Sequence, residues 1–292
     1  MTLSSLGCSR VVAGMWRVLE WKMSERELSN YVQDAIESGI STFDHADVYG
    51  RGAVETLFGQ ALTYSPGQRH KLQLVSKVGI RPTNSPGVRI KHYDTSATYL
   101  RDSVEQSLVR LKTDYLDLFL IHRPDPLPCL DEIAEAAQTL KQQGKIRAFG
   151  VSNYSTQQFD LLHARTALST NQFECSPFEA GAVESGMFTA LAQADVSPMI
   201  WSPLGGGRLF SETDPVAVRV REAMKSVQEH LGASSWQAIA YAWLFRLPGT
   251  PYVIAGSRRR EALVDALEGV KLQLSREHWF AILEAARGQP VA

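Results

Sequence analysis

Cysteine is scarce in this sequence of 292 residues. It has three, Cys8, Cys129 and Cys175, an odd number at wide spacings without a metal-ligand pattern. Such spacing argues against a disulfide framework and against a zinc site, and it is typical of reduced thiols. The first ten residues also lack the basic-then-apolar layout of a secretory signal. We therefore expect a cytoplasmic protein without a structural metal.

Neither sign of charge is in excess, and no apolar run is long. Lysine and arginine number 30 against 31 aspartates and glutamates, which gives a net charge of −1. This balance gives no reason to expect nucleic acid or an anionic membrane as a partner. No segment reaches the roughly 20 apolar residues that a membrane-spanning helix needs. The expected partner is a small molecule.

The sequence has no low-complexity segment and no linker rich in proline and glycine that would divide it. Instead, short apolar runs alternate with amphipathic stretches that have apolar residues at helical spacing, such as Val54, Leu57, Phe58 and Ala61. Few of the apolar runs alternate with polar residues, as expected of parallel strands that are buried on both faces. The runs predicted as strands are 11–15, 41–43, 72–76, 116–121, 146–151, 170–173, 198–200 and 252–254.

Eight strands, most of them followed by a helix, favour an α/β fold of the (β/α)8 TIM barrel type, formed by a single domain over residues 1–292. A doubly wound open sheet is the alternative. At the start of the first helix, Ser24 and Glu27 predict a capping box. A barrel also predicts where the active site lies, because functional residues of such barrels follow the carboxyl ends of the strands.

Polar residues stand at three successive predicted strand ends. Asp44 follows the second strand, Lys77 the third and His122 the fourth, and Tyr49 comes five residues after Asp44. Each has an ordinary interpretation when taken alone: a turn former, a solvated lysine, a locally satisfied histidine and a packing tyrosine. Their joint occurrence at the same end of a predicted barrel points to an active site.

This set of residue types suits carbonyl reduction. Hydride addition to a carbonyl requires a proton for the developing alkoxide. Tyrosine has a reference pKa of about 10, and a nearby ammonium lowers that value. We therefore expect Lys77 to lower the pKa of Tyr49, Asp44 to hold Lys77 through an ion pair, and His122 to orient the carbonyl oxygen.

Two segments carry a resemblance to a known family. Segment 43–50, FDHADVYG, with Glu55 and Gly59 after it, and segment 113–118, TDYLDL, which leads to His122, resemble the signatures of the aldo-keto reductase superfamily. The likeness extends over nearly the whole chain and is closest to the bacterial YdhF-type oxidoreductases. It implies a (β/α)8 barrel, NADPH-dependent reduction of aldehydes or ketones, and a catalytic tetrad of Asp44, Tyr49, Lys77 and His122. Because members are often monomers, it also implies a monomer or a weak oligomer.

The resemblance further implies how NADP(H) would bind. Hydroxyl and amide groups after the fifth and sixth strands would hold the carboxamide, an aromatic ring after the seventh would stack on the nicotinamide, and a glycine loop would hold the pyrophosphate. The implied cofactor residues are Trp16, Asp44, Ser152, Asn153, Gln172, Trp201, Ser202, Leu204, Gly205, Gly206, Gly207, Arg208, Gly256, Ser257, Arg258, Arg259 and Arg260.

Simpler interpretations remain for parts of this set. Ser152 and Asn153 would also suit helix caps, the triple glycine a flexible loop, and the arginines 258–260 a solvated turn. In the family this last segment binds the adenosine 2′-phosphate, which favours NADPH over NADH. Ala262 and the pair Asp265-Ala266 depart from the fuller family pattern, so which arginine would contact the phosphate stays open.

The expected substrate site is open and favours flat or apolar carbonyl compounds. Its predicted residues are Trp16, Val48, Tyr49 and His122, with the loop 79–94 as a further wall. Two other functions are weighed. One is a cofactor-binding sensor or accessory subunit with little turnover. The other is a lyase or isomerase with Lys77 as a Schiff-base amine, which leaves Tyr49 and the arginines 258–260 unexplained.

Overall fold

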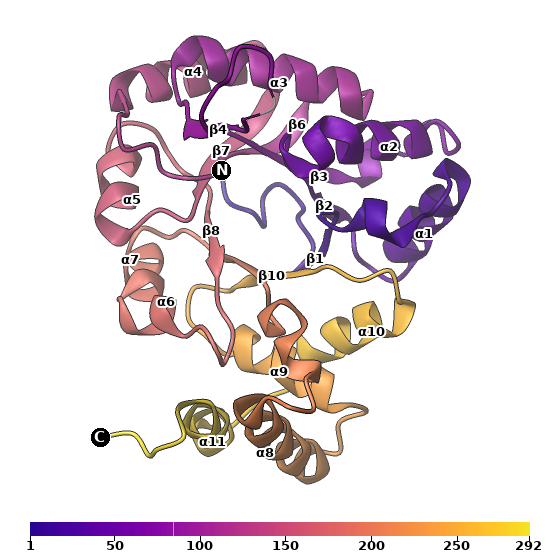
Figure 1. Ribbon diagram of the computed structural model, residues 1–292, viewed down its shortest axis with the longest axis vertical. Helices are drawn as coiled ribbons and strands as arrows, with labels where there is room; N and C mark the ends of the chain where they lie inside the picture. The colour runs from indigo at the N-terminus through magenta and orange to yellow at the C-terminus, as the bar shows by residue number, and fades with distance from the viewer. Residues whose placement is uncertain (84) are drawn as a thin grey trace. The chain divides into compact units, whose positions relative to one another are not determined.

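The computed structural model describes residues 1–83 and 85–292 (Figure 1). Its strands form a closed barrel in the order β1-β10-β9-β8-β7-β6-β3-β2. The barrel strands are β1 (Val11–Gly14), β2 (Thr42–Asp44), β3 (Gln73–Val78), β6 (Leu116–Ile121), β7 (Ile146–Ser152), β8 (Asn171–Glu174), β9 (Met199–Trp201) and β10 (Tyr252–Ala255). The predicted barrel is confirmed, with each predicted strand correct to within two residues at either end. The open sheet is wrong because the strand order closes on itself.

Helices follow the strands along the chain. They are α1 (Glu25–Glu37), α2 (Ala53–Leu62), α3 (Ala97–Leu111), α4 (Leu130–Gln142), α5 (Thr156–His163), α6 (Gly181–Glu184), α7 (Met187–Gln193), α8 (Pro215–Leu231), α9 (Trp236–Phe245), α10 (Arg260–Gly269) and α11 (Arg276–Arg287). The predicted capping box of α1 is confirmed, since Ser24 Oγ accepts from the Glu27 N–H and Glu27 Oε2 accepts from the Ser24 N–H. The sequence did not predict the antiparallel pair β4 (Ile80–Arg81) and β5 (His92–Tyr93).

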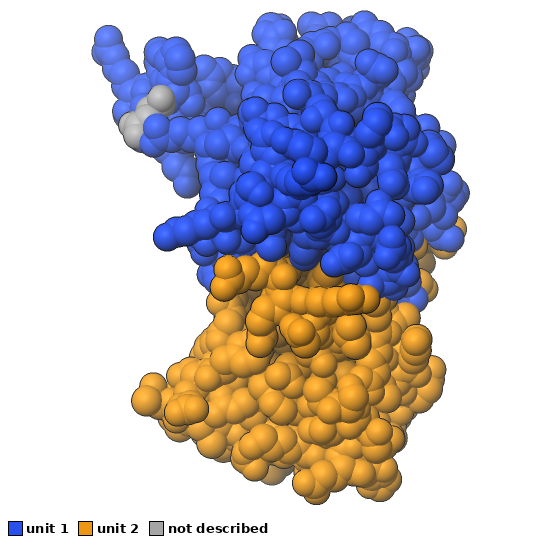
Figure 2. Space-filling model, turned by 90° about the vertical axis from the view of Figure 1, so that its right-hand side faces the viewer, with its two compact units in different colours: residues 1–172 blue, residues 173–292 orange. Residues whose placement is uncertain are grey.

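The described chain groups into two compact units, residues 1–172 and 173–292 (Figure 2). In the first unit the helices pack in chain order, α1 on α2, α2 on α3 and α3 on α4 (Figure 1). In the second, α10 packs on α9 and α11 on α8. A single domain over residues 1–292 stays a prediction. No helix in the described part of the chain has the length and hydropathy to cross a membrane.

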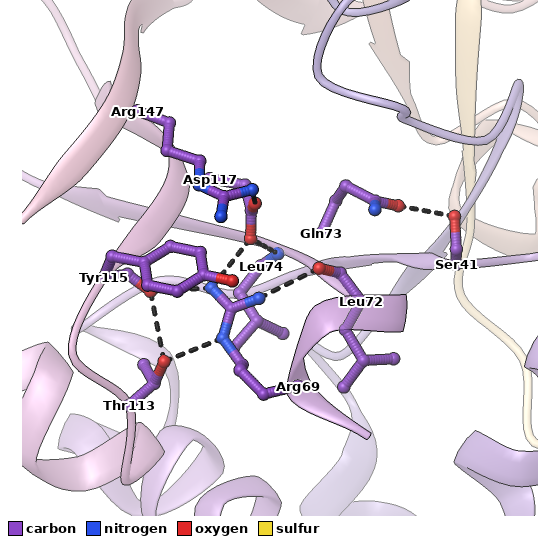
Figure 3. Close-up of polar contacts among 9 residues, drawn as sticks. All are labelled: Ser41, Arg69, Leu72, Gln73, Leu74, Thr113, Tyr115, Asp117 and Arg147. Atoms are coloured by element: carbon purple, nitrogen blue, oxygen red, sulfur yellow. Dashed lines mark hydrogen bonds and ion pairs between the residues drawn. The ribbon is translucent and has the colours of Figure 1, made fainter. Parts of the chain in front are cut away.

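A buried aspartate joins the amino-terminal ends of three strands (Figure 3). Asp117, in β6, is fully buried and accepts hydrogen bonds from the Leu74 N–H of β3, from Arg69 Nη2 at 2.8 Å and from Arg147 Nη1 of β7 at 3.1 Å. Both guanidinium groups also lie over the ring of Tyr115, at 3.9 and 4.1 Å from its centroid. Because residues at this end of a barrel serve stability, the aspartate of segment 113–118 has a structural role.

Two residues of the segment after Tyr49 hold α2 against its neighbours. Glu55 is fully buried and accepts from Ser76 Oγ at 2.5 Å and from Arg110 Nε at 2.7 Å. A Cβ at Gly59 would lie 2.1 Å from the carbonyl oxygen of Arg110, so only glycine permits this approach of α2 to α3. The contacts fix the start of α2, which directly follows Tyr49–Gly52.

The same cluster affects Asp47. Burial and the neighbouring Glu55 carboxylate raise the pKa of Asp47 to about 7, against the opposing charge of Arg110. Within the part of the chain that the structure describes, its Oδ1 atom is buried without a hydrogen-bond partner. An ionised carboxylate in this place destabilises the folded state.

Replacement of the buried aspartate should destabilise the protein. We expect Asp117→Asn to lower the free energy of unfolding by about 2–4 kcal/mol, because it leaves two guanidinium groups without their carboxylate, although both are partly exposed to solvent. Urea denaturation measures this loss. The exposed Asp114 three residues earlier provides the control, and an equal effect of Asp114→Asn would contradict the assignment.

Removal of the charge on Asp47 should stabilise the protein in a pH-dependent way. The carboxyl has a raised pKa in the folded state, so it binds its proton more tightly there than in the unfolded chain. Its destabilising effect is therefore absent at about pH 4, grows as the pH rises to about 7, and is complete above that. We expect Asp47→Asn to raise the midpoint of thermal unfolding at about pH 8 and to change it little at about pH 4. The same gain at both values would contradict this explanation.

Candidate active site

A buried ion pair connects the ends of β2 and β3. Asp44 is the last residue of β2, and its Oδ1 accepts from Lys77 Nζ at 2.5 Å. The ammonium also donates to the carbonyl oxygen of His45 at 2.8 Å. Lys77 is 1% exposed and Asp44 3%. The sequence placed Lys77 after the third strand, but β3 continues to Val78, so Lys77 lies within it.

Tyr49 and His122 lie next to this pair. Tyr49 begins the short helix η2 (Tyr49–Gly52) after β2, and the centroid of its ring is 5.1 Å from Lys77 Nζ. His122 directly follows β6, and its ring meets that of Tyr49 edge-on with centroids 5.7 Å apart. The structure therefore brings together all four residues that the sequence singled out, within the first compact unit.

The protonation states differ in part from the expectation. Burial raises the pKa of Tyr49, and the Lys77 ammonium opposes this without overcoming it. We expected a lowered pKa for Tyr49, and this expectation is wrong in its net direction. The sequence does not show how far Tyr49 is buried, and burial outweighs the effect of Lys77. Burial favours neutral Lys77, but Asp44 and Tyr49 outweigh it and raise the pKa of the ammonium. Burial and the charge of Lys77 hold the pKa of His122 well below its usual value, so the imidazole is neutral.

Three polar residues predicted to hold the carboxamide contact this group. Gln172, the second residue of β8, donates from Nε2 to Asp44 Oδ2 at 2.8 Å. Asn153 Nδ2 donates to Ser152 Oγ at 2.8 Å and to the His122 carbonyl oxygen at 3.1 Å. The capping interpretation of Ser152 and Asn153 is wrong, because α5 is capped by Ser155.

The predicted substrate residues lie beside the same strand ends. Val48 directly precedes Tyr49, and both are partly buried. Trp16 follows β1 with 60% of its surface exposed, and the Arg17 guanidinium lies over its ring. Loop 79–94 contains the β4–β5 pair, and its residue 84 lies outside the described residues.

The remaining predicted cofactor residues belong to the second unit. Trp201 ends β9, and Ser202 after it has a φ of 53°. Gly205, Gly206 and Gly207 open the helix η4 (Gly205–Phe210) with positive φ values. A Cβ at Gly205 would lie 2.6 Å from the Phe178 ring. Glycine is therefore required here by close packing as well as by the positive φ value.

Arg208, expected to add positive charge to that loop, forms an ion pair within its own unit. Its Nε lies 2.5 Å from Asp214 Oδ2, and Asp214 caps α8. The arginines 258–260, by contrast, are exposed and form no ion pair with any other described residue. They follow Gly256 and Ser257 after β10 and lead into α10, where the N-cap residue Arg259 makes no side-chain cap.

Sequence reasoning missed two participants. The first is His45, whose carbonyl oxygen accepts a hydrogen bond from Lys77. The His45 ring is fully buried, and its centroid lies 4.4 Å from that of the Phe58 ring. Burial lowers the pKa of this imidazole to about 3. Asp47 is the second, and its backbone N–H donates to the carbonyl oxygen of Lys77 at 3.0 Å. A main-chain carbonyl acceptor cannot be recognised from a sequence. Asp47 could have been found, because it lies between Asp44 and Tyr49, which the sequence already singles out. Among the described residues, no group of three or more histidines, cysteines or acids is arranged to hold a metal ion.

Comparisons with known proteins identify the family of this chain. The profile of the aldo/keto reductase family matches residues 10–287. The oxidoreductases YcsN of Bacillus subtilis and YdhF of Escherichia coli are 43% and 44% identical, each over 97% of this chain and 96% and 95% of their own. A 6-dehydroglucose reductase of Agrobacterium fabrum is 37% identical over 98% of this chain and 97% of its own.

Solved structures are similar as well. Glycerol dehydrogenase from Gluconobacter oxydans superposes with a TM-score of 0.83 at 26% identity, covering 98% of this chain and 94% of its own. An aldo/keto reductase of Klebsiella pneumoniae in complex with NADP and acetate gives 0.76 at 27% identity, over 97% and 93%. With a closed barrel, relatives above 40% identity and a profile matching nearly all of its length, this chain belongs to the aldo/keto reductase family of oxidoreductases.

Proposed function

We propose that this protein reduces aldehydes or ketones to alcohols with NADPH, and that Tyr49 donates the proton. The observation that carries the proposal is the buried Lys77, which is held by Asp44 at 2.5 Å and lies beside the Tyr49 ring. An ammonium buried next to a tyrosine stabilises the tyrosinate that remains after the proton has left. A buried lysine with only a structural role would not require a tyrosine next to it.

The raised pKa of Tyr49 fits the role of an acid. Burial keeps the hydroxyl protonated at neutral pH, so the proton is present when the carbonyl arrives. The Lys77 ammonium has three N–H donors, of which two are bound by Asp44 and the His45 carbonyl, which leaves the third for the neighbouring Tyr49. As the proton moves to the alkoxide oxygen, that third donor would form a charge-assisted hydrogen bond with the developing phenolate.

His122 would orient the carbonyl. Because its imidazole is neutral, one ring nitrogen carries a proton and can donate a hydrogen bond to the carbonyl oxygen of the substrate. A neutral donor stabilises the negative charge that develops on this oxygen without competing with Tyr49 as the acid. Val48 and the exposed ring of Trp16 would form walls of the substrate site.

The residues present suit a nicotinamide dinucleotide phosphate. The Ser152 hydroxyl and the Asn153 and Gln172 amides offer both donors and acceptors, as a carboxamide requires. The exposed arginines 258–260, with the uncapped start of α10, suit a phosphate group. Trp16, Trp201, Ser202, Leu204, the glycines 205–207, Arg208, Gly256 and Ser257 complete the proposed set. The bound cofactor would supply the hydride, and the NADP complex of the Klebsiella relative supports this choice.

The Schiff-base alternative does not fit the state of Lys77. An amine must lose its proton before it attacks a carbonyl. In this site Asp44 and Tyr49 together outweigh the effect of burial and raise the pKa of Lys77, so the ammonium form predominates at neutral pH. The arrangement therefore favours an electrostatic role for Lys77 over a nucleophilic one.

Tyr49→Phe tests the acid directly, since phenylalanine keeps the ring and loses only the hydroxyl. We expect the rate of NADPH oxidation with a panel of aldehydes to fall by a factor of about 10²–10⁴, as expected on loss of a general acid. The affinity for NADPH, followed by fluorescence, should change little. In the wild type the rate should be retained through neutral pH and lost only as the pH rises through the raised pKa of Tyr49.

Tyr64→Phe serves as the matched control, because Tyr64 is exposed and its hydroxyl donates a hydrogen bond only to Glu25 among the described residues. It should reduce aldehydes at the wild-type rate. If the Tyr49 variant is equally fast, Tyr49 is not the acid. If the wild type binds NADPH tightly yet reduces no carbonyl, the sensor function replaces the reductase.

A further inference from the structure

Gln172 holds the second oxygen of the Asp44 carboxylate. Its side chain is 2% exposed, and Nε2 donates to Oδ2 of Asp44 at 2.8 Å, while Lys77 Nζ binds Oδ1 at 2.5 Å. The carboxylate is thus held from two sides by residues of two different strands, β3 and β8. The resemblance gave Gln172 a role toward the cofactor alone.

Two partners constrain a carboxylate more than one. The terminal torsion of an aspartate is broad, so a carboxylate bound through a single oxygen can turn about its last bond. A second hydrogen bond, made to the other oxygen by a buried donor, restricts this rotation and keeps Oδ1 directed at Lys77. In a buried site such bonds are strong, because water does not compete for the carboxylate.

The Gln172 amide also reduces the negative charge that Lys77 and Tyr49 experience. Asp44 and Lys77 have opposite effects on Tyr49, since the carboxylate favours the protonated hydroxyl and the ammonium favours the tyrosinate. An N–H group that donates to the carboxylate moderates its effect. Loss of this donor should increase the electrostatic effect of the Asp44 charge on Tyr49 and should make Tyr49 harder to deprotonate.

We propose that Gln172 is a positioning residue, which fixes the Asp44 carboxylate under Lys77 and thereby sets how readily Tyr49 gives up its proton. The inference rests on the proposed function, in which Tyr49 is the acid. It differs from a role in cofactor binding alone, because it acts through Asp44 and operates before any cofactor has bound.

Gln172→Met removes the amide and keeps the length of the side chain. We expect kcat to fall by about tenfold to a hundredfold, the range for one hydrogen bond to a charged group. The alkaline loss of activity should shift to higher pH. A residue that only contacted the carboxamide would instead raise the KM for NADPH and leave the pH profile of kcat unchanged.

Gln172→Glu provides the conservative rescue. The introduced carboxyl can donate to Asp44 only while it is protonated, and its ionisation next to a carboxylate is disfavoured, which raises its pKa. We therefore expect kcat close to that of the wild type at acidic pH and a loss as the pH rises and the new group ionises. This pH dependence would be absent from both the wild type and Gln172→Met.

A second readout needs no cofactor. In heteronuclear NMR spectra of the free protein, the buried Lys77 ammonium should give a slowly exchanging signal, assigned by its absence in Lys77→Met. The exchange of its protons should be faster in Gln172→Met, because the carboxylate that holds the ammonium is less fixed. Asn171→Leu is the control, since Asn171 is the neighbouring buried amide of β8 and its Nδ2 donates to the Tyr154 carbonyl oxygen at 2.9 Å.

The proposal is overturned if Gln172→Met retains the wild-type pH profile and ammonium exchange, or if Asn171→Leu alters both to the same extent. If Gln172→Met does not fold, the pH dependence of Gln172→Glu decides the matter alone. Failure of the proposed function is distinguishable, because in that case Tyr49→Phe retains its activity whatever Gln172 does.

Discussion

The ion pair between Asp44 and Lys77 is the interaction on which the site depends. A charged lysine that is 1% exposed would be strongly destabilising without a partner, and Asp44 at 2.5 Å offsets that cost. The pair keeps a positive charge beside Tyr49. Because this charge is buried, water does not screen it. In the proposed reaction, a charge that is already in place would stabilise the developing phenolate without reorganisation.

The two ends of the strands have different tasks. At the amino-terminal ends of β3, β6 and β7, Asp117 binds two arginines and a backbone N–H, which ties the strands together. At the carboxyl ends of β2, β3 and β8, Asp44, Lys77 and Gln172 form a hydrogen-bonded polar group beside the Tyr49 ring. Glu55 and Gly59 support the site from outside the barrel strands. They hold α2 against α3 and so fix the turn that contains Tyr49.

Much of this could be predicted from the sequence, because buried parallel strands appear as short apolar runs and polar residues at their ends are easily recognised. Lys77 was placed after its strand because a charge interrupts the apolar run, although the strand continues to Val78. The β4–β5 pair escaped prediction because two-residue strands have no periodicity. The bond from Gln172 to Asp44 joins residues 128 positions apart, and the net shift of the pKa of Tyr49 depends on burial. Neither can be recognised from local pattern.

The most direct test of this account is single-turnover oxidation of NADPH by Lys77→Met with an aldehyde, with NADPH binding measured on the same folded sample. Methionine fills much of the space of the lysine and removes its charge together with its N–H donors. The account predicts binding within a few-fold of the wild type and a chemical step slower by a factor of about 10³ or more. A chemical step within about tenfold of the wild-type rate, at full cofactor occupancy, would contradict the claim that this ion pair activates Tyr49.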